Sequence, residues 1–419
     1  MNHFRFALVV FASSLGLAYA QDEEARRAPP VEIPDFSNLD EYIYEPKSTF
    51  TLGIRHVSGA KTSFTANKGS IASRFAPGDD ATTLQNRSYQ DGNVQLDTRS
   101  TPQLDGDGNP VIIDNQQQLV PLPNDGKTNT WNYTDLSQRA RQDFIAFHDY
   151  SAEIRPTATI EKDSTASMGA DIQVHRDMGK FFGGRVAWTL TAGLSVNDIS
   201  ANTAGTVNAD ITSITDYYRF HTQNGGMLPD PPYSAPSSTT ESVLGPDGSV
   251  VTGADGTTST RTVDTTVLLD NIPQFRERNP FATNASVTNR WKVKGAYYTF
   301  RAGPTLWIPI TTRLKASLGA GVALAYAGTS YTVTETLTPD VGTEISETES
   351  SEDYKLLPGF YADATLQFDL TERAGLYAGA VYQSTGDYTQ TVENATTSYS
   401  TKIDLSRQNG VRAGMTIRF

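Results

Sequence analysis

The chain has 419 residues, and its 47 Asp and Glu outnumber its 34 Lys and Arg, giving a formal net charge of −13 at pH 7. This acidity argues against nucleic acid as a partner, because nucleic acid binding favours basic surfaces. Cysteine is absent, which excludes a disulfide framework and a lipid anchor carried on cysteine.

The first 20 residues have the order of a secretory signal peptide. Arg5 precedes an apolar run at 6–17, and the segment ends in the small-residue sequence Ala18-Tyr19-Ala20. That run is too short for a membrane-spanning helix, and no later segment approaches 18 consecutive apolar residues. We therefore expect a cleaved signal peptide at 1–20, a polar, proline-bearing N-terminal tether at 21–47 and the folded domain at 48–419.

From residue 49 onward, apolar and polar residues alternate in many segments, which predicts β-strands with one apolar and one polar face. In 167–176, for example, Met168, Ala170 and Ile172 alternate with Gly169 and Asp171. The segments with this pattern are 49–57, 167–176, 185–196, 296–308, 313–326, 359–370, 375–383 and 410–419.

The two faces of these eight strands differ in a way that separates a barrel from a sandwich. The apolar face carries no charge through its central residues, and the other face is Gly, Ser, Thr and Ala with scattered Arg, Asp and Tyr. The outer face of a soluble sandwich would be rich in Lys and Glu. A small, crowded interior and a lipid-facing exterior explain the composition better.

The connections support the same fold. Short connections at 177–184, 309–313 and 370–375 alternate with long ones, as periplasmic turns and external loops do in outer-membrane barrels. The sequence thus predicts an all-β, antiparallel transmembrane β-barrel of about eight strands. Ten strands remain an alternative because 143–154 also alternates, although we favour a hairpin within the first long loop. The predicted external loops are 58–166, 200–290, 327–355 and 384–402.

Two features are expected at the rims of the barrel. Pro304 interrupts the ladder of its strand, which predicts a β-bulge near the periplasmic rim. Aromatic residues are expected to form outward-facing belts at both membrane interfaces. Those near the short turns are Phe181, Phe182, Trp307, Phe368 and Phe419, and those near the long loops are Trp291, Tyr297, Tyr298, Tyr326, Tyr331 and Tyr388.

The final strand carries a family resemblance. With its signal peptide, its lack of cysteine and this terminal strand, the sequence resembles bacterial outer-membrane β-barrel proteins of the small, roughly eight-stranded kind. The resemblance implies location in the outer membrane, among lipid and lipopolysaccharide, and a C-terminal signal read by the outer-membrane insertion machinery. The residues that match this signal are Val411, Ala413, Met415, Ile417 and Phe419.

Charged residues recur on the polar faces of the strands. Because buried charges must be paired, we expect them to form a network that fills the lumen, and an eight-strand cross-section barely holds its own side chains. The predicted network consists of Arg55, Asp171, Arg185, Arg301, Arg313, Lys315, Asp363, Asp369 and Arg412.

Few residues are candidates for catalysis. The segment at 147–151 offers His148, Asp149 and Ser151, and another strand offers Asp171 and His175. Residues four apart on a strand are separated by about 13 Å, so neither set forms a catalytic site alone. We expect no enzyme and no cofactor, and interpret His175 as a histidine of the lumen network.

The acidic stretch 335–353 has seven carboxylates and no basic residue. We interpret it as a solvated, mobile loop; a sharper hypothesis is a site for divalent cations, which bridge carboxylates to lipopolysaccharide phosphates. The segment 105–114 begins like a calcium loop, but Pro110 stands where the turn glycine belongs, so a β-turn is the better interpretation.

The function predicted from sequence is therefore broad. We expect a structural or surface-interaction role in the bacterial outer membrane, exerted through long acidic loops. A narrow porin-like channel is the alternative, and a barrel hydrolase is less favoured because the sequence lacks the motifs of such enzymes.

Overall fold

The computed structural model describes residues 47–419 except 77, 142, 158, 165, 184, 223–226, 247, 254–255 and 281–283. The predicted signal peptide and all but the last residue of the tether lie outside the described residues. Within this part of the chain, the regular elements are β-strands and one 3-10 helix at Leu136–Gln138. The prediction of an all-β antiparallel fold is confirmed. None of the described helical residues forms a helix long and apolar enough to cross a membrane.

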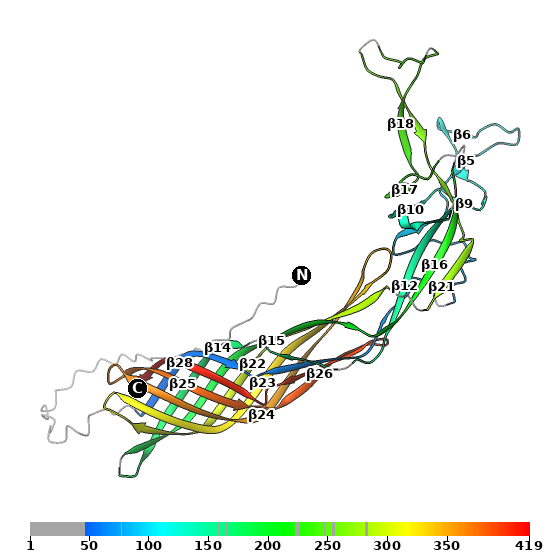
Figure 1. Cartoon of the computed structure of the whole chain (residues 1–419). Coiled ribbons are helices and arrows are strands. Elements are labelled where there is room, and N and C mark those ends of the chain that lie inside the picture. Colours follow the sequence, from blue (N-terminus) through cyan, green and yellow to red (C-terminus); the bar gives the residue numbers. More distant parts are fainter. Residues whose placement is uncertain are drawn as a thin grey trace, which may run out of the picture. The chain divides into compact units, whose positions relative to one another are not determined.

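Eight strands pair antiparallel in a closed ring (Figure 1). The ring closes through β1, which pairs with β14 on one side and with the C-terminal β28 on the other. The eight alternating segments of the sequence all lie in it. In ring order the strands are β1 (Ser48–Ser58), β14 (Ser167–Phe181), β15 (Val186–Val207), β22 (Ser286–Pro309), β23 (Leu314–Thr338), β24 (Ile345–Asp369), β25 (Ala374–Ser384) and β28 (Gln408–Arg418).

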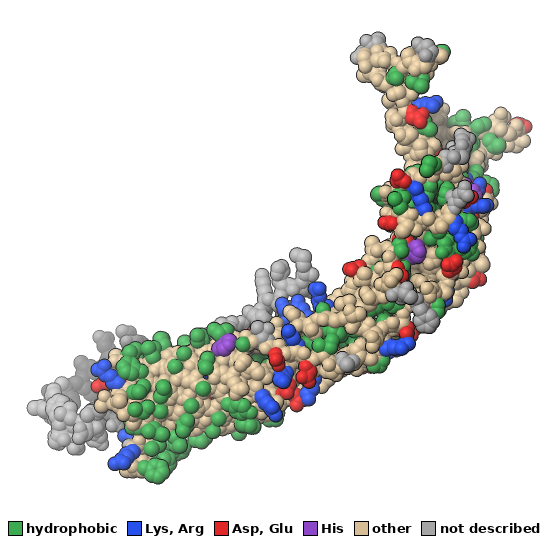
Figure 2. Space-filling model, viewed as in Figure 1, with side chains coloured by type: hydrophobic (Ala, Val, Ile, Leu, Met, Phe, Trp, Pro, Cys, Tyr) green, Lys and Arg blue, Asp and Glu red, His purple; other side chains and the backbone are tan. Residues whose placement is uncertain are grey.

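The alternation of each strand decides which side chains face outward. The apolar set is exposed, with Leu318 at 56%, Val322 at 68% and Ile417 at 50%, whereas inward-facing Arg55 and Asp171 are 1% and 0% exposed. Figure 2 shows the hydrophobic side chains gathered over the ring strands, with charged side chains at both ends of this zone. The ring is therefore apolar outside and polar inside.

The predicted bulge at Pro304 is absent. Pro304 lies opposite Leu190, and on the other side the register of Ala302 with Val322 continues unchanged to Thr305 with Gly319. Gly303 and Gly321 allow this, because a Cβ on either would lie 2.2 Å from a backbone oxygen of the opposite strand. Because these two glycines have no side chains, the strands can approach closely beside Pro304 and the pairing continues past it. The register shift of the ring lies instead in β14, between Asp177 and Gly179.

The ring has one end of short turns and one end where strands continue. At the first end Ser48 and Phe419 exchange backbone hydrogen bonds of 3.1 and 3.0 Å. At the other end β15, β22, β23 and β24 run on, and β23 and β24 form one hairpin that ends at Thr338 and resumes at Ile345. The prediction of a loop at 327–355 is wrong, because Thr and Ser replace apolar residues on the outward face without ending the strands.

A second sheet of ten strands is built from the other segments predicted as loops. The segment 143–154 does not form a hairpin confined to the first long loop. It forms β12 and pairs along its whole length with β16, from the next long connection. The main path is β26 (Asp387–Glu393), β27 (Ser398–Asp404), β2 (Lys61–Ile71), β12 (Phe144–Ile154), β16 (Ala209–His221), β20 (Leu268–Asp270) and β9 (Lys127–Thr128); β11 (Arg139–Arg141), β13 (Ile160–Asp163) and β21 (Phe275–Asn279) pair with β12, β2 and β16.

Smaller sheets complete the described chain. The carboxylate of Asp105 accepts the N–H groups of Asp107 and Asn109 at 3.0 and 2.8 Å, so 105–109 forms the predicted turn. One sheet contains β17 (Tyr233–Ala235), β10 (Trp131–Tyr133), β4 (Gly92–Val94) and β3 (Arg87–Ser88). Three hairpins pair β18 (Ser238–Ser242) with β19 (Thr260–Asp264), β5 (Ser100–Pro102) with β8 (Leu119–Pro121), and β6 (Ile112–Ile113) with β7 (Gln116–Gln117).

The extended ring strands and the second sheet share a hydrophobic core. Phe64 of β2 stacks on Trp291 of β22 and Tyr331 of β23, with ring centroids 6.2 and 6.1 Å apart. Trp291 and Tyr331, with Tyr297 and Tyr388, were expected in an outward belt but are buried inside. Tyr298 and Tyr326 do face outward and pair across their strands. The inward side of this end is thus packed with aromatic rings.

Glu335 lies inside that core, although it belongs to the acidic stretch expected to be solvated. It is 2% exposed and faces Asn289 and Glu347 across its two neighbouring strands, and the Tyr399 hydroxyl lies beside its carboxyl. Gly69 leaves the space it occupies, since a Cβ there would lie 2.7 Å from Oε1. Burial raises the pKa of the Glu335 carboxyl.

We expect Glu335→Gln to stabilise the protein at neutral pH. A raised pKa means that the folded state holds the proton more tightly, so the free energy of unfolding falls as pH rises through the folded pKa. The variant has no carboxyl to deprotonate and lacks this loss, so its unfolding free energy relative to that of the wild type should increase from pH 4 to pH 8. Urea unfolding at pH 4 and pH 8 measures the difference.

The exposed Glu352→Gln on the same hairpin is the matched control and should show no such pH dependence. Equal stabilities of wild type and Glu335→Gln at both pH values would contradict the assignment.

Candidate functional site

The polar interior of the ring contains a chain of ion pairs contributed by four strands. Asp171 of β14 accepts from Arg301 of β22 with one oxygen and from Arg412 Nη1 of β28 at 3.3 Å with the other. The same guanidinium pairs with Asp363 of β24 and donates to Thr365 at 2.8 Å. These four charged residues were all predicted, and the structure brings them together.

Arg55 extends this network without a carboxylate partner among the described residues. Its guanidinium donates to Ser195 Oγ and to Gln383 Oε1, each at 2.7 Å, and Gln383 in turn donates to Thr299 at 3.0 Å. Neutral acceptors that are themselves hydrogen-bonded satisfy a buried cation less strongly than a carboxylate does. The interior therefore holds three buried arginines against two buried aspartates.

Each of these charged side chains stands directly opposite a glycine of the neighbouring strand. The cross-strand pairs are Arg55 with Gly169, Asp171 with Gly53, Arg301 with Gly193, Asp363 with Gly319, and Arg412 with Gly379. A missing side chain on one strand gives the charged side chain of the next the room to cross the interior. This pairing explains how an eight-strand cross-section accommodates five long or charged groups.

The remaining predicted members divide between the two ends. Asp369 pairs with Lys315 at 3.0 Å and with Arg418 at 2.9 Å near the short turns, where all three are partly exposed. Arg185 and Arg313 are exposed in the short turns and lie outside the network. β15 begins at Val186 and β23 at Leu314, one residue after each arginine, so neither arginine is held on the inward face of a strand.

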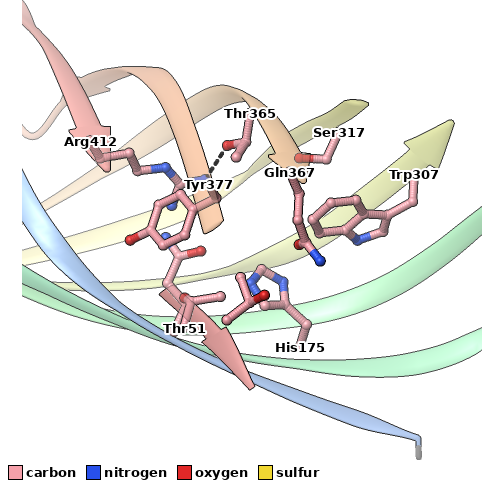
Figure 3. A pocket seen from close by; sticks show the side chains of 10 residues that line it. Thr51, His175, Trp307, Ser317, Thr365, Gln367, Tyr377 and Arg412 are labelled. Carbon is pink, nitrogen blue, oxygen red and sulfur yellow. Dashed lines mark hydrogen bonds between the residues drawn. The ribbon is translucent and has the colours of Figure 1, made fainter. Parts of the chain in front are cut away.

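A small cavity lies between the ion pairs and the short turns (Figure 3). His175 donates to or accepts from Thr191 at 2.8 Å and meets the edge of Trp307, with ring centroids 5.9 Å apart. Trp307 therefore faces inward, not into the predicted aromatic belt. The cavity offers about 10 Å³ to the centre of a water-sized sphere, which is room for about one water molecule.

Sequence reasoning missed the aromatic residues of this interior. The Arg301 and Arg412 guanidiniums lie 5.5 and 5.7 Å from the ring centroids of Tyr361 and Tyr377, distances typical of cation–π contacts. Both tyrosines occupy polar-face positions of their strands, so the alternation itself placed them inside. The predicted lumen network included only charged residues.

The residues considered for catalysis do not converge. His148 Nδ1 lies 2.6 Å from Asp91, whereas Asp149 faces the other side of β12 and accepts from Ser73 and from the Arg74 N–H. Burial raises the pKa of the Asp149 carboxyl. No group of three His, Asp or Glu placed to hold a metal occurs among the residues that the structure describes.

We expect Arg412→Gln to destabilise the protein by about 3–5 kcal/mol, because it leaves Asp363 as an uncompensated buried charge. Urea unfolding of the full-length protein in detergent micelles, followed by tryptophan fluorescence, measures the loss. Arg418→Gln is the matched control: Asp369 keeps Lys315 and the pair is partly exposed, so the cost should be about 0–1 kcal/mol. Similar costs for the two variants would rule out the network as described.

No family model and no curated protein matches the chain. Among solved structures, it is similar to the outer membrane protease OmpT from Escherichia coli, with 6% identity, 89% of this chain and 96% of that chain covered, and a TM-score of 0.27. It is also similar to a Pseudomonas aeruginosa FadL homologue (8%, 89% and 90%, TM-score 0.16) and to the P. putida toluene transporter TodX (7%, 90% and 91%, TM-score 0.16).

Proposed function

We propose that this protein is a non-conducting outer-membrane β-barrel that holds a β-sheet extension outside the membrane for interaction with surface partners. The observation that carries the proposal is the ring itself, which is apolar and exposed outside and closed by paired charges inside. In water such an exterior would be an aggregation hazard, whereas lipid is its natural solvent.

The height of the apolar zone fits a membrane. On β23 the outward apolar residues run from Ala316 to Tyr326, followed by Gly328 and Ser330. Ten residue steps span about 33 Å of strand, or about 25 Å of height at the usual tilt of about 40°, which equals the apolar band of known outer-membrane barrels. Outward Tyr326 and Tyr354 stack at its upper boundary, with centroids 6.2 Å apart, as interface tyrosines do.

The orientation follows from the two ends. The short turns and the paired termini Ser48 and Phe419 would face the periplasm, which also suits Val411, Ala413, Met415, Ile417 and Phe419 as the insertion signal. The long strands and the second sheet would then face outward, where lipopolysaccharide is the surrounding lipid. From the sequence of its acidic residues, we likewise propose that the hairpin of β23 and β24 binds divalent cations.

The interior argues against the channel alternative. The ion-pair network crosses the ring, and above it the stacked rings of Phe64, Trp291 and Tyr331 fill the space between the two sheets. An ion would have to displace both a charged network and a hydrophobic core. The second sheet has its own aromatic core around Trp131 and Phe147.

Charged substitutions should map the lipid-facing band. Leu318→Lys is expected to weaken folding into phospholipid vesicles by about 2–4 kcal/mol, the cost of a lysine at the midplane. Thr332→Lys, on the same face of β23 but beyond the apolar zone, should insert like the wild type. Urea titration of folding into vesicles compares them, and equal insertion of both variants would exclude a membrane boundary between these positions.

Planar-bilayer recordings test the closed interior. The inserted wild-type protein should show no discrete conductance steps, because the ion-pair network and the aromatic core both cross the interior. Reproducible steps that persist after removal of residues 239–263, which comprise nearly all of the β18–β19 hairpin, would overturn the non-conducting assignment while leaving the barrel intact.

A further inference from the structure

At the Phe144 end of β12, the second sheet has one packed face and one partly exposed face, which we call the open face; further along β12, Tyr150 and Ala152 on the Phe144 face are buried in the core shared with the ring strands. Ile145, Phe147 and Tyr218 point into its hydrophobic core. Phe144 and Arg219, which are opposite each other across β12 and β16, therefore point the other way, as does Tyr217. Phe275 of β21 lies opposite Tyr217 and joins this open face.

A row of alternating charge and ring crosses the open face. Arg141 of β11 pairs with Phe144 of β12, and Phe144 pairs with Arg219 of β16. Two strand spacings separate the arginines, so their Cα atoms are about 10 Å apart. We call Arg141, Phe144 and Arg219 the arginine row.

Both guanidiniums of the arginine row are supported by aromatic rings. The Arg141 guanidinium lies 5.3 Å from the Phe275 ring centroid, and the Arg219 guanidinium 5.7 Å from that of Phe144. Phe275 in turn stacks on Tyr217, with centroids 4.4 Å apart. Such contacts hold the cations in place without neutralising them, and ring edges add partial positive charge.

Neither arginine has a carboxylate partner among the described residues, although the chain is strongly acidic. Three arginines of the same strands and their neighbours are paired, Arg139 with Asp230, Arg276 with Asp216 and Arg155 with Asp210, whereas Arg278 of β21 has no ion pair among the described residues. The nearest carboxylate that shares the open face on β21, Glu277, accepts from the Tyr217 hydroxyl at 3.2 Å. The row thus presents two exposed, oriented and unneutralised cations.

We propose that the exposed face around the arginine row binds an anionic polysaccharide, with the two arginines of the row holding its carboxylates. The Phe144 and Phe275 rings beside the guanidiniums also offer an apolar surface on which a sugar ring can lie. Guanidinium forks also match carboxylates in geometry. The proposal rests on the proposed function only in placing this sheet outside the lipid.

Calorimetry on the full-length protein in non-ionic detergent micelles tests the proposal independently of membrane insertion. The probes are a hyaluronan hexasaccharide, which alternates acidic and neutral sugars, a neutral chitohexaose, and a poly-glutamate peptide of equal charge. We expect the hexasaccharide to bind, its affinity to fall with added salt, and the other two probes to bind at least tenfold more weakly.

Variants assign the binding to the row. Arg141→Gln/Arg219→Gln should reduce hexasaccharide affinity at least tenfold, and Arg219→Lys should retain part of it because charge remains while the fork is lost. Arg290→Gln, at an exposed position on ring strand β22, is the matched control and should bind like the wild type. Circular dichroism checks that each variant is folded.

Three results overturn the proposal: no measurable hexasaccharide binding by the wild type, unchanged binding by the double variant, or peptide binding as tight as that of the hexasaccharide. The last would identify an acidic protein segment as the partner. A protein that binds in micelles but fails to insert into vesicles would instead contradict the proposed membrane location.

Discussion

The pairing of β1 with β28 is the constraint on which the rest of the structure depends. Lipid offers no hydrogen-bond partners, so a ring that faces lipid must pair every backbone N–H and C=O within itself. Closure also fixes the register: Arg55 lies opposite Arg412, and Ile54 opposite Ala413. A slip by one residue would turn the arginine at 412 outward and the alanine at 413 inward, so the register that closes the ring also gathers the charges.

The charged interior is a consequence of that closure. Asp171 and Arg412 are 241 positions apart in the chain, and they meet only when the first and last strands are neighbours. Glycines opposite the charged residues supply the volume, and the aspartates supply the counter-charge. Network and ring are therefore mutually dependent: an open ring would leave Asp363 without Arg412, and an uncharged interior would leave the space opposite Gly379 and Gly319 unfilled.

The sequence predicts the ring well and the extension poorly, for a physical reason. In the ring, an apolar exterior and a crowded polar interior enforce a strict two-residue period, which identifies Leu318 as outward and Arg301 as inward. Beyond Tyr326 the outward residues of β23 are Gly, Ser and Thr, and outward threonines such as Thr332 no longer distinguish one face from the other. The buried Glu335 and Trp291 follow from packing against β2 and β27, contacts that bring together distant segments and leave no local pattern. Arg185 and Arg313 were wrongly predicted to face the interior, because they lie just outside the ends of their strands, where boundaries predicted from sequence patterns are least accurate.

Two barriers, one above the other, close the interior and leave the outer surfaces for the proposed interaction with partners. The lower one is electrostatic, between Asp171, Arg301 and Arg412, and the upper one is hydrophobic, around Phe64 and Trp291. Opening the first would leave charges uncompensated in a small space, and opening the second would expose large aromatic rings to water. The interior cavity has room for about one water molecule, so opening either barrier would not provide an internal binding site for a partner. The surfaces that remain available without disrupting a core are the open faces and edges of the second sheet, which is where the unpaired arginines lie.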